Sequence, residues 1–387
     1  MHSTPIPTPS SEAIAASQQL EQYIATDIIA QGGRIAFSRF MQHALYAPKL
    51  GYYTGGSRKI GATGDFITAP ALTPLFAQTL AIQLAQILPQ TAGNIYEFGA
   101  GTGTLAADLL NALSGSLKHY FIIELSPDLA QRQREYIAQH APEKLSSVIW
   151  LNTLPENFNG IIIGNEVLDA MPVERILMKE NGAYQQAFVC HNENGFFIEY
   201  QDLNHNDLFQ AAQTYFPAPQ TQNYVSELHP AQHAFIRTLA EKLTCGSMIW
   251  LDYGFDAAQY YHPQRTDGTL IGHHRHHTTH DPFFHVGLTD LTAHVNFSDI
   301  AAAAYESGLD LIGYTNQATF LFNLGILDLL AKQFPETNTP QYVQTAHAVN
   351  VLTGSHEMGE LFKIIAFGKD VDVDWLGFTH GDLCHKL

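Results

Sequence analysis

A glycine-rich turn constrains the fold of this chain more than any other feature. The apolar run at residues 94–98 leads into a turn with glycine at every second position, namely Gly99, Gly101 and Gly103. Glycine there lets the backbone adopt positive φ and lets a ligand lie against bare main chain. A helix is predicted next, and the strand after it ends in Glu124. An acid about 20 residues past such a turn holds ribose hydroxyls, so the pattern predicts a βαβ unit that binds a nucleoside.

Details of the turn favour one nucleoside class over another. A dinucleotide fingerprint is G-x-G-x-x-G, but Thr104 stands where its third glycine belongs. Glu97 lies two residues before the first glycine, where a carboxylate would repel a pyrophosphate and suit an ammonium group. E-x-G-x-G-x-G followed by an acid that ends the next strand is similar to the S-adenosylmethionine site of class I methyltransferases. A purely structural turn in another α/β protein is the alternative.

Polar residues also follow other predicted strands. Asn152 closes one β-branched run, and the run at 161–163 leads into Asn165, Glu166 and Asp169. The carboxyl ends of the strands form the ligand-binding edge of an open α/β sheet. We therefore expect a cofactor or substrate role for at least one of the last three residues, with helix capping by Asp169 as the alternative.

The chain divides into three predicted regions. A helical N-terminal region should pack on the nucleoside-binding unit as a lid, and a mostly parallel Rossmann-like sheet of the α/β class should form the core. An antiparallel meander is inserted in it, because alternating apolar and polar runs are joined by two Asn-Gly pairs, which are strong hairpin signals. These regions are residues 1–90, residues 91–172 together with 223–387, and residues 173–222.

Composition narrows the partners and the location. A formal net charge of −18 argues against a nucleic-acid partner, because binding to phosphates relies on clusters of Lys and Arg. No stretch is long and apolar enough for a membrane span. Three scattered cysteines indicate a reducing compartment, and the first residues carry neither an apolar signal core nor a basic residue before Arg34. We expect a cytoplasmic protein, with a homodimer as its possible assembly.

A cluster of histidines lies at residues 273–285. Clustered His can ligate zinc or nickel. However, no Cys joins them, and their spacing is not that of one helical face, so we expect a polar loop at the substrate edge and no metal.

Seven segments, the glycine turn among them, carry a resemblance, in the order L-Y-A-P-K-L-G-Y-Y, G-A-T-G-D-F-I-T-A-P, E-F-G-A-G-T-G-T-L, G-N-E-V-L-D-A-M-P-V, D-Y-G, R-H-H-T-T-H-D-P-F and D-L-T-A-H-V-N-F. Together they resemble the MidA-like family of S-adenosylmethionine-dependent methyltransferases, which includes the mitochondrial protein arginine methyltransferase of respiratory complex I assembly. The resemblance runs from Leu45 to Phe297. It implies a class I fold and S-adenosylmethionine as cofactor, and the residue patterns above add the helical N-terminal lid and the inserted β-meander. It also implies that Asp65 and Thr68 contact the cofactor.

The same resemblance implies a protein substrate that presents an arginine, on a complex I subunit or its homologue. A guanidinium stays charged at neutral pH, so carboxylates that hold it bidentately can orient the attacking nitrogen. Glu166 is the first candidate for this catalytic carboxylate, and Glu227 is the second. Two alternatives stay open, a non-catalytic assembly factor that binds S-adenosylmethionine and a NAD-type oxidoreductase.

Overall fold

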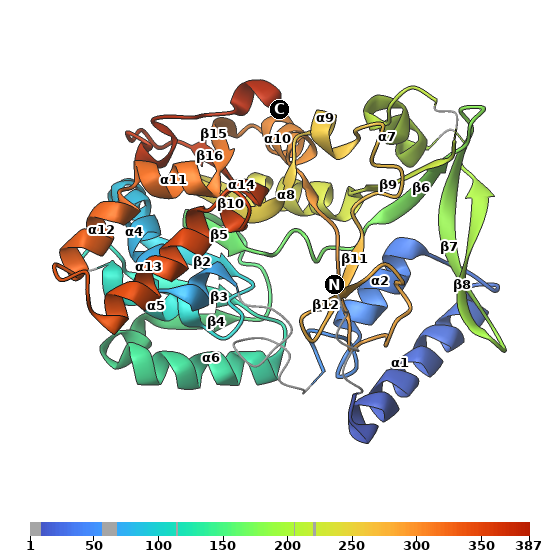
Figure 1. The fold of residues 1–387 in the computed structure, drawn as a ribbon, viewed down its shortest axis with the longest axis horizontal. Coiled ribbons are helices and arrows are strands. Elements are labelled where there is room, and N and C mark those ends of the chain that lie inside the picture. Colours follow the sequence, from blue (N-terminus) through green and yellow to red (C-terminus); the bar gives the residue numbers. More distant parts are fainter. Residues whose placement is uncertain (1–8, 56–67, 114, 205, 220–221) are drawn as a thin grey trace.

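The computed structural model describes residues 9–55, 68–113, 115–204, 206–219 and 222–387. Its centre is an eight-stranded sheet with helices on both faces (Figure 1). Only β16 runs against its neighbours in the ordered path, which makes the sheet mostly parallel and confirms the Rossmann-like core. The path is β15 (Asp310–Asn316), β16 (Phe362–Lys369), β10 (Leu243–Phe255), β5 (Phe158–Asn165), β2 (Asn94–Phe98), β3 (His119–Ile123) and β4 (Val148–Leu151), and β14 (Val295–Asn296) pairs with β10.

Buried isoleucines of the central strand β5 contact helices on both faces of this sheet. Ile161, Ile162 and Ile163 in β5 are fully buried, and successive side chains of a strand point to opposite faces. Ile161 and Ile163 pack with α4 (Leu75–Ile87) and α5 (Thr104–Ala112). Ile162 packs on the other face, with α8 (Pro230–Lys242) and α10 (Phe297–Glu306). A continuous β-branched run of this kind is typical of a parallel strand between two helical layers.

Further helices complete the layers around the sheet. The helical stretch from Gln317 to Gln333 is interrupted at Gly325, which adopts a left-handed φ of 78°. The remaining elements here are α6 (Pro127–His140), α9 (Ala257–Tyr260), α11 (Gln317–Asn323), α12 (Ile326–Gln333), α13 (Pro340–Thr353), α14 (Met358–Leu361), and the 3-10 helices η1 (Leu88–Gln90), η2 (Pro142–Ser147), η3 (Leu376–Phe378) and η4 (Cys384–Lys386).

The inserted meander is part of a larger antiparallel sheet. Two Asn-Gly turns join its central strands as predicted, with Gly182 and Gly195 at φ of 80° and 106°. The segment at 224–228 does not return to the core as expected, because it pairs with β6 and extends the sheet. The five strands are β1 (Ile35–Ala36), β6 (Glu174–Met178), β7 (Tyr184–Asn192), β8 (Gly195–Asp202) and β9 (Tyr224–Leu228), with α7 (Asp207–Tyr215) between β8 and β9.

The N-terminal region does not act as one lid over the nucleoside-binding unit. α1 (Ser11–Ala30) and α2 (Phe37–Tyr46) pack their apolar faces on the antiparallel sheet (Figure 1). Short α3 (Ala69–Leu72) and α4 pack instead against α5 of the core. The loop after α2 reaches back to the edge of the main sheet, as the contacts of its tyrosines show below.

The histidine-rich segment is a hairpin rather than a loop. β11 (Ile271–His274) and β12 (His277–Thr279) flank Arg275 and His276, which both adopt the positive φ of a type I′ turn. β13 (Asp290–Thr292) pairs with β11 to complete a three-stranded sheet. Within the described ranges, no group of three His, Cys, Asp or Glu side chains is placed to hold a metal ion, and no helix is long and apolar enough to cross a membrane.

Candidate active site

Two turns meet at the carboxyl edge of the main sheet. The strand order reverses between β2 and β5, and open α/β sheets bind their ligands at such a switch point. The glycine turn follows β2, and the segment from Asn165 to Asp169 follows β5. The two turns touch, because a Cβ added to Gly99 would lie 2.7 Å from Cγ2 of Val167. Any ligand of the glycine turn therefore borders on the turn after β5.

Glycine is required throughout the first turn. Gly99, Gly101 and Gly103 adopt φ of 65°, 52° and 89°, in the left-handed region that L side chains rarely occupy. Gly103 also begins α5 as its N-cap residue. The first backbone N–H groups of that helix therefore lie next to bare main chain, which is the geometry expected of a nucleoside-binding turn.

Gln133, a residue that the sequence did not indicate, links Glu124 to this turn by hydrogen bonds. Its Oε1 accepts a hydrogen bond from the Ser126 backbone N–H at 2.8 Å, and its Oε2 accepts one from Nε2 of Gln133 at 3.0 Å. The same nitrogen donates to the Gly101 carbonyl at 3.1 Å. Gln133 is fully buried in α6, so it fixes the distance between the acid and the turn. A glutamine on the buried face of a helix was the one signal for it.

Glu97 is placed differently from the expectation. It is 2% exposed, and its Oε2 accepts a hydrogen bond of 2.8 Å from the Tyr120 hydroxyl. Burial raises the pKa of this carboxyl to about 8, so it is largely protonated at neutral pH. A buried acid with its own partner does not present a negative charge to an ammonium group, and the predicted contact is not supported.

The other predicted cofactor residues lie around the same edge. Asn152 is exposed directly after β4, whose last residue, Leu151, accepts the backbone N–H of Glu124 at 2.9 Å. Thr68 is half-buried at the start of α3, and the next residue, Ala69, contacts the Glu166 carboxylate through its backbone. Asp65 lies outside the described residues.

The turn after β5 is held by a buried carboxylate from β10. Asp252 is 1% exposed, and its Oδ2 accepts the backbone N–H groups of Val167, Leu168 and Asp169 at 3.1, 2.9 and 3.3 Å. Glu166 adopts a φ of 54°, a left-handed conformation that costs a non-glycine residue roughly 1–2 kcal/mol. Strain of this kind is found at functional sites, where the surrounding structure maintains it.

Two acids of this turn form an electron-rich patch. Oε1 of Glu166 accepts a hydrogen bond of 3.0 Å from Nδ2 of Asn165, and Asp169 accepts one from the Tyr253 hydroxyl. Burial and the nearby Asp169 raise the pKa of Glu166 to about 8, and burial raises the pKa of Asp169 to about 6. Among the described residues, Oδ1 of Asn165 and Oδ1 of Asp169 are buried and have no hydrogen-bond partner. Such acceptors call for a donor from a ligand.

Tyrosines from the N-terminal region border this patch, and the sequence marked their segment but assigned them no role. Tyr46 donates to the Ala170 carbonyl at 3.1 Å, and it stacks on Tyr53 with ring centroids 5.4 Å apart. The Tyr53 hydroxyl lies 2.9 Å from each carboxylate oxygen of Asp290 in β13. The segment L-Y-A-P-K-L-G-Y-Y therefore joins the site, although it is far from the strand ends in sequence.

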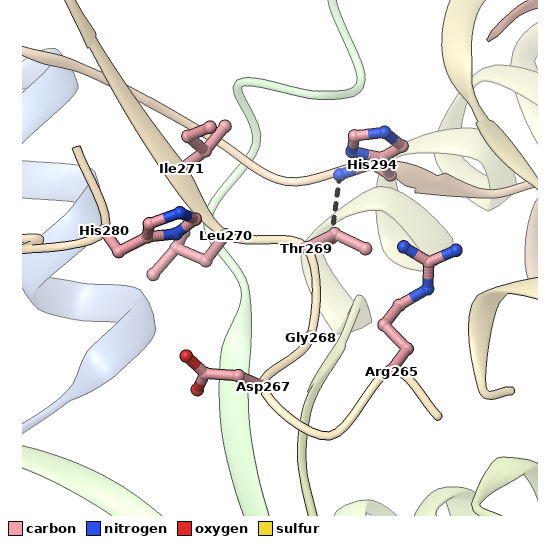
Figure 2. Close-up of a pocket in the computed structure, with 8 residues that line it drawn as sticks. All are labelled: Arg265, Asp267, Gly268, Thr269, Leu270, Ile271, His280 and His294. Carbon is pink, nitrogen blue, oxygen red and sulfur yellow. Dashed lines mark hydrogen bonds between the residues drawn. The ribbon is translucent and has the colours of Figure 1, made fainter. Parts of the chain in front are cut away.

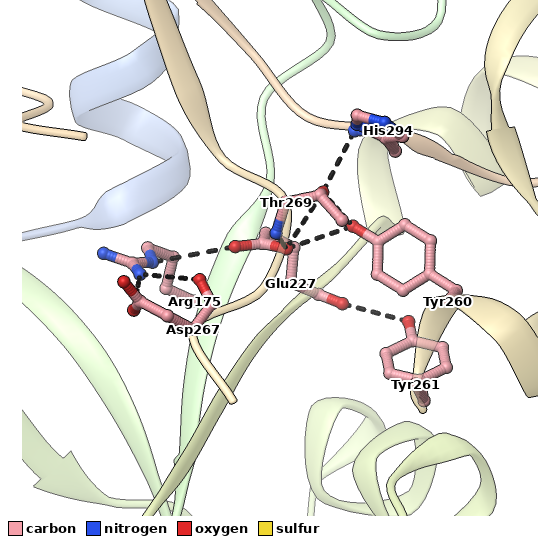
Figure 3. A network of polar contacts seen from close by, with 7 residues as sticks. All are labelled: Arg175, Glu227, Tyr260, Tyr261, Asp267, Thr269 and His294. Carbon is pink, nitrogen blue, oxygen red and sulfur yellow. Dashed lines mark hydrogen bonds and ion pairs between the residues drawn. The ribbon is translucent and has the colours of Figure 1, made fainter. Parts of the chain in front are cut away.

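Glu227 does not lie at this edge. It is fully buried in β9, where Oε1 lies 3.8 Å from Nε of Arg175 and Oε2 accepts hydrogen bonds from Thr269 and Tyr260 (Figure 3). Gly268 covers it so closely that an added Cβ would lie 2.2 Å from its Oε1. The structure gives Glu227 a structural role, which corrects its choice as a second catalytic carboxylate.

The fold and this edge together define a class I methyltransferase. Residues 79–315 match the model of a family described as S-adenosyl-L-methionine-dependent methyltransferase, and the chain belongs to this family. S-adenosylmethionine is accordingly the cofactor, and the NAD-type oxidoreductase and the non-catalytic assembly factor are set aside.

Solved structures and curated proteins agree with this assignment. A protein from Burkholderia thailandensis, solved with bound S-adenosyl-homocysteine, is 42% identical with a TM-score of 0.94, over 99% of this chain and 100% of that one. The protein arginine methyltransferase NDUFAF7, mitochondrial, of Danio rerio is 26% identical over 92% of this chain and 88% of its own. Its counterpart from Homo sapiens is 26% identical over 86% and 80%.

One expectation is overturned by these relatives. A cytoplasmic protein was predicted, and this prediction is contradicted because the curated relatives are named as mitochondrial proteins. The prediction rested on the composition of the first residues, and that composition does not determine where a protein resides.

Proposed function

We propose that this methyltransferase modifies an arginine side chain of a partner protein, and that Glu166 and Asp169 hold the guanidinium. The observation that carries the proposal is the pair of adjacent acids on the turn that touches the glycine turn, with a buried carboxylate oxygen of Asp169 lacking a donor among the described residues. A guanidinium offers five N–H donors in a fixed plane and matches carboxylates bidentately. The names of the curated relatives support the same acceptor.

The cofactor would be held by residues of the first turn. The glycine backbone and the N-terminus of α5 suit the amino-acid and ribose parts of the ligand, and Glu124 suits the ribose hydroxyls. Oδ1 of Asn165, buried and without a described partner, offers a further acceptor at the junction of the two turns. When bound, S-adenosylmethionine supplies an electrophilic methyl group to the acceptor nitrogen.

The chain's own residues would orient and deprotonate the acceptor. Glu166, whose raised pKa is about 8, would give up its proton beside a bound guanidinium, because a nearby opposite charge favours the ionised form. Two carboxylates on one side of a guanidinium draw its charge toward them and leave a nitrogen on the other side to attack, and fixing this approach supplies much of the rate. Asp169, whose pKa burial raises to about 6, can accept the proton that the methylated nitrogen releases. Asp252 acts only through the backbone of the turn and is a positioning residue.

Identification of the product tests the proposal. The full chain is incubated with methyl-labelled S-adenosylmethionine and an extract of its source, and the labelled protein is hydrolysed to amino acids. We expect methylarginine in the hydrolysate. Label in another amino acid would assign a different acceptor to the same site. On the family resemblance of the sequence, we further propose a respiratory complex I subunit or its homologue as the partner.

A further inference from the structure

A separate pocket lies beside the acceptor patch, which is the pair of acids Glu166 and Asp169 on the turn after β5. It has a volume of about 210 Å³ and opens between the loop that precedes β11 and the segment that joins β13 to β14. Figure 2 shows Arg265 and His294 on one side of Thr269, with Asp267 and His280 on the other. Gly268 separates the pocket from the buried Glu227, so that acid is not part of its lining.

Arg265 is the residue that gives the pocket its chemistry. Its guanidinium is half-buried and lies over the Phe255 ring, 4.6 Å from the centroid. Among the described residues it makes no ion pair, and its Nε is buried without a hydrogen-bond partner. The missing ion pair is notable because the chain has 37 acidic residues for 19 basic ones. Asp267 lines the same pocket, but its Oδ1 is engaged by Arg175 at 2.9 Å. A partly buried cation without an acid favours a ligand that brings one.

His294 adds a neutral polar group rather than a second charge. Burial first, and then the nearby Arg265, lower the pKa of His294 to about 4. Its Nδ1 is buried and lacks a partner among the described residues. One fixed cation and one neutral ring nitrogen form a site for a single carboxylate, whereas His280 is exposed at the rim.

The pocket and the acceptor patch share a wall. The His294 ring meets the Tyr253 ring edge to face, with centroids 5.1 Å apart, and the Tyr253 hydroxyl bonds Asp169. Ile271 of the pocket pairs with Thr292 across β11 and β13, and alternation along β13 places Thr292 and Asp290 on the same face. The aromatic pair of Tyr253 and His294 therefore separates the acceptor patch, which suits a cation, from the pocket, which suits an anion.

We propose that this pocket is a specificity subsite, which binds an Asp or Glu side chain of the protein substrate close to the methylated arginine. The inference rests on the proposed function. Acids at the acceptor patch and Arg265 in the pocket would repel a substrate bound in the wrong direction, so opposite charges fix its register. Each residue of an extended substrate spans about 3.3 Å, so the fixed distance between the two places sets a fixed spacing between the arginine and the acid.

A peptide scan tests the subsite. The probes are nine-residue Ser/Gly peptides with one central arginine and one Asp moved through every other position, and a reference peptide has no Asp. Methyl transfer is measured, and so is peptide binding to protein saturated with S-adenosylhomocysteine. The wild-type chain should prefer Asp at one fixed position at least tenfold. Arg265→Gln should remove that preference without changing methyl transfer to the reference peptide or its binding. Arg237→Gln is the matched control, because Arg237 lies on the exposed side of α8 and pairs only weakly, at 3.9 Å, with Glu241.

The two readouts separate this inference from the proposed function. Arginine methylation without an Arg265-dependent preference for Asp would overturn the subsite and leave the proposed function intact. Arg265-dependent binding of Asp peptides without methylation would support the subsite and contradict arginine as the acceptor. Absence of both would overturn both. Unfolding temperatures of the two variants within a few degrees of wild type show that neither effect comes from misfolding.

Discussion

The cofactor side of the site and its acceptor side draw on very different lengths of chain. The glycine turn, Glu124 and Gln133 all lie within residues 99–133, and hydrogen bonds among them are local. The acceptor side gathers Glu166 from the end of β5, Asp252 from β10, Asp290 from β13 and tyrosines from the loop after α2. A local site can be recognised as a motif, whereas a dispersed one becomes visible only when the chain is folded.

The division implies that each side can be damaged without the other. Cofactor affinity should depend on the glycine turn, Glu124 and Asn165, and transfer should depend also on the acids and tyrosines. The following substitutions test this separation in order of decreasing expected effect.

Gly101→Val should abolish cofactor binding. Gly101 has a φ of 52°, which a β-branched residue cannot adopt without strain, and its side chain would occupy the face that the ligand needs. Wild-type protein at 100 times the dissociation constant of S-adenosylhomocysteine should gain about 2.7 kcal/mol of unfolding free energy, and the variant should gain none. Gly115→Val is the matched control, because Gly115 has a φ of 100° and an added Cβ meets nothing within 4 Å. Normal ligand stabilisation of Gly101→Val would show that the cofactor site is misplaced.

Glu97→Gln should change stability with pH and leave both binding and transfer intact. The folded-state pKa of Glu97 is raised to about 8, so the native protein binds a proton that the unfolded chain releases above its ordinary pKa of 4.5. This contribution to stability is complete below pH 4.5 and is lost as pH rises toward 8. In urea unfolding, the glutamine variant should have the same free energy of unfolding as wild type at pH 4.5. At pH 8 its free energy of unfolding should be higher than that of wild type, by at most roughly 4 kcal/mol. A weakened affinity for S-adenosylhomocysteine would instead return Glu97 to the cofactor contacts.

Glu166→Gln should impair transfer and spare the cofactor. Glutamine keeps the shape and the bond to Asn165 but loses the charge, and a hydrogen bond to a charged group contributes about 1.5–3 kcal/mol. Methyl transfer should fall roughly 10- to 100-fold, at about 1.4 kcal/mol per decade. The exposed Glu156→Gln serves as the control for loss of one charge. Equal losses of transfer and of cofactor affinity would assign Glu166 to the cofactor side.

Tyr53→Phe should have the smallest effect. It removes the hydroxyl that lies 2.9 Å from both oxygens of Asp290, and a neutral donor of this kind contributes about 1 kcal/mol. Transfer should fall about fivefold with unchanged cofactor affinity, measured beside the exposed Tyr305→Phe. An unchanged rate would remove Asp290 and its tyrosine from the acceptor side.

Individual residues show which parts of the fold and of the site the sequence could predict. Gly99, Glu124 and the β-branched run at 161–163 predicted the sheet and its ligand edge because motif spacing and strand period are local properties. Gln133 and Tyr53 were missed, since their roles depend on which strand ends lie next to them. Glu227 was misjudged for the same reason, because only the folded chain shows Gly268 and Arg175 enclosing it.

A crystal structure of the full chain with S-adenosylhomocysteine would show whether the cofactor side and the acceptor side meet where the glycine turn touches the turn after β5. We expect the ribose hydroxyls within hydrogen-bond distance of Glu124, and the sulfur on the side of Asn165 and Glu166. A ligand whose ribose lies away from Glu124, or whose sulfur faces away from the acids, would contradict this arrangement.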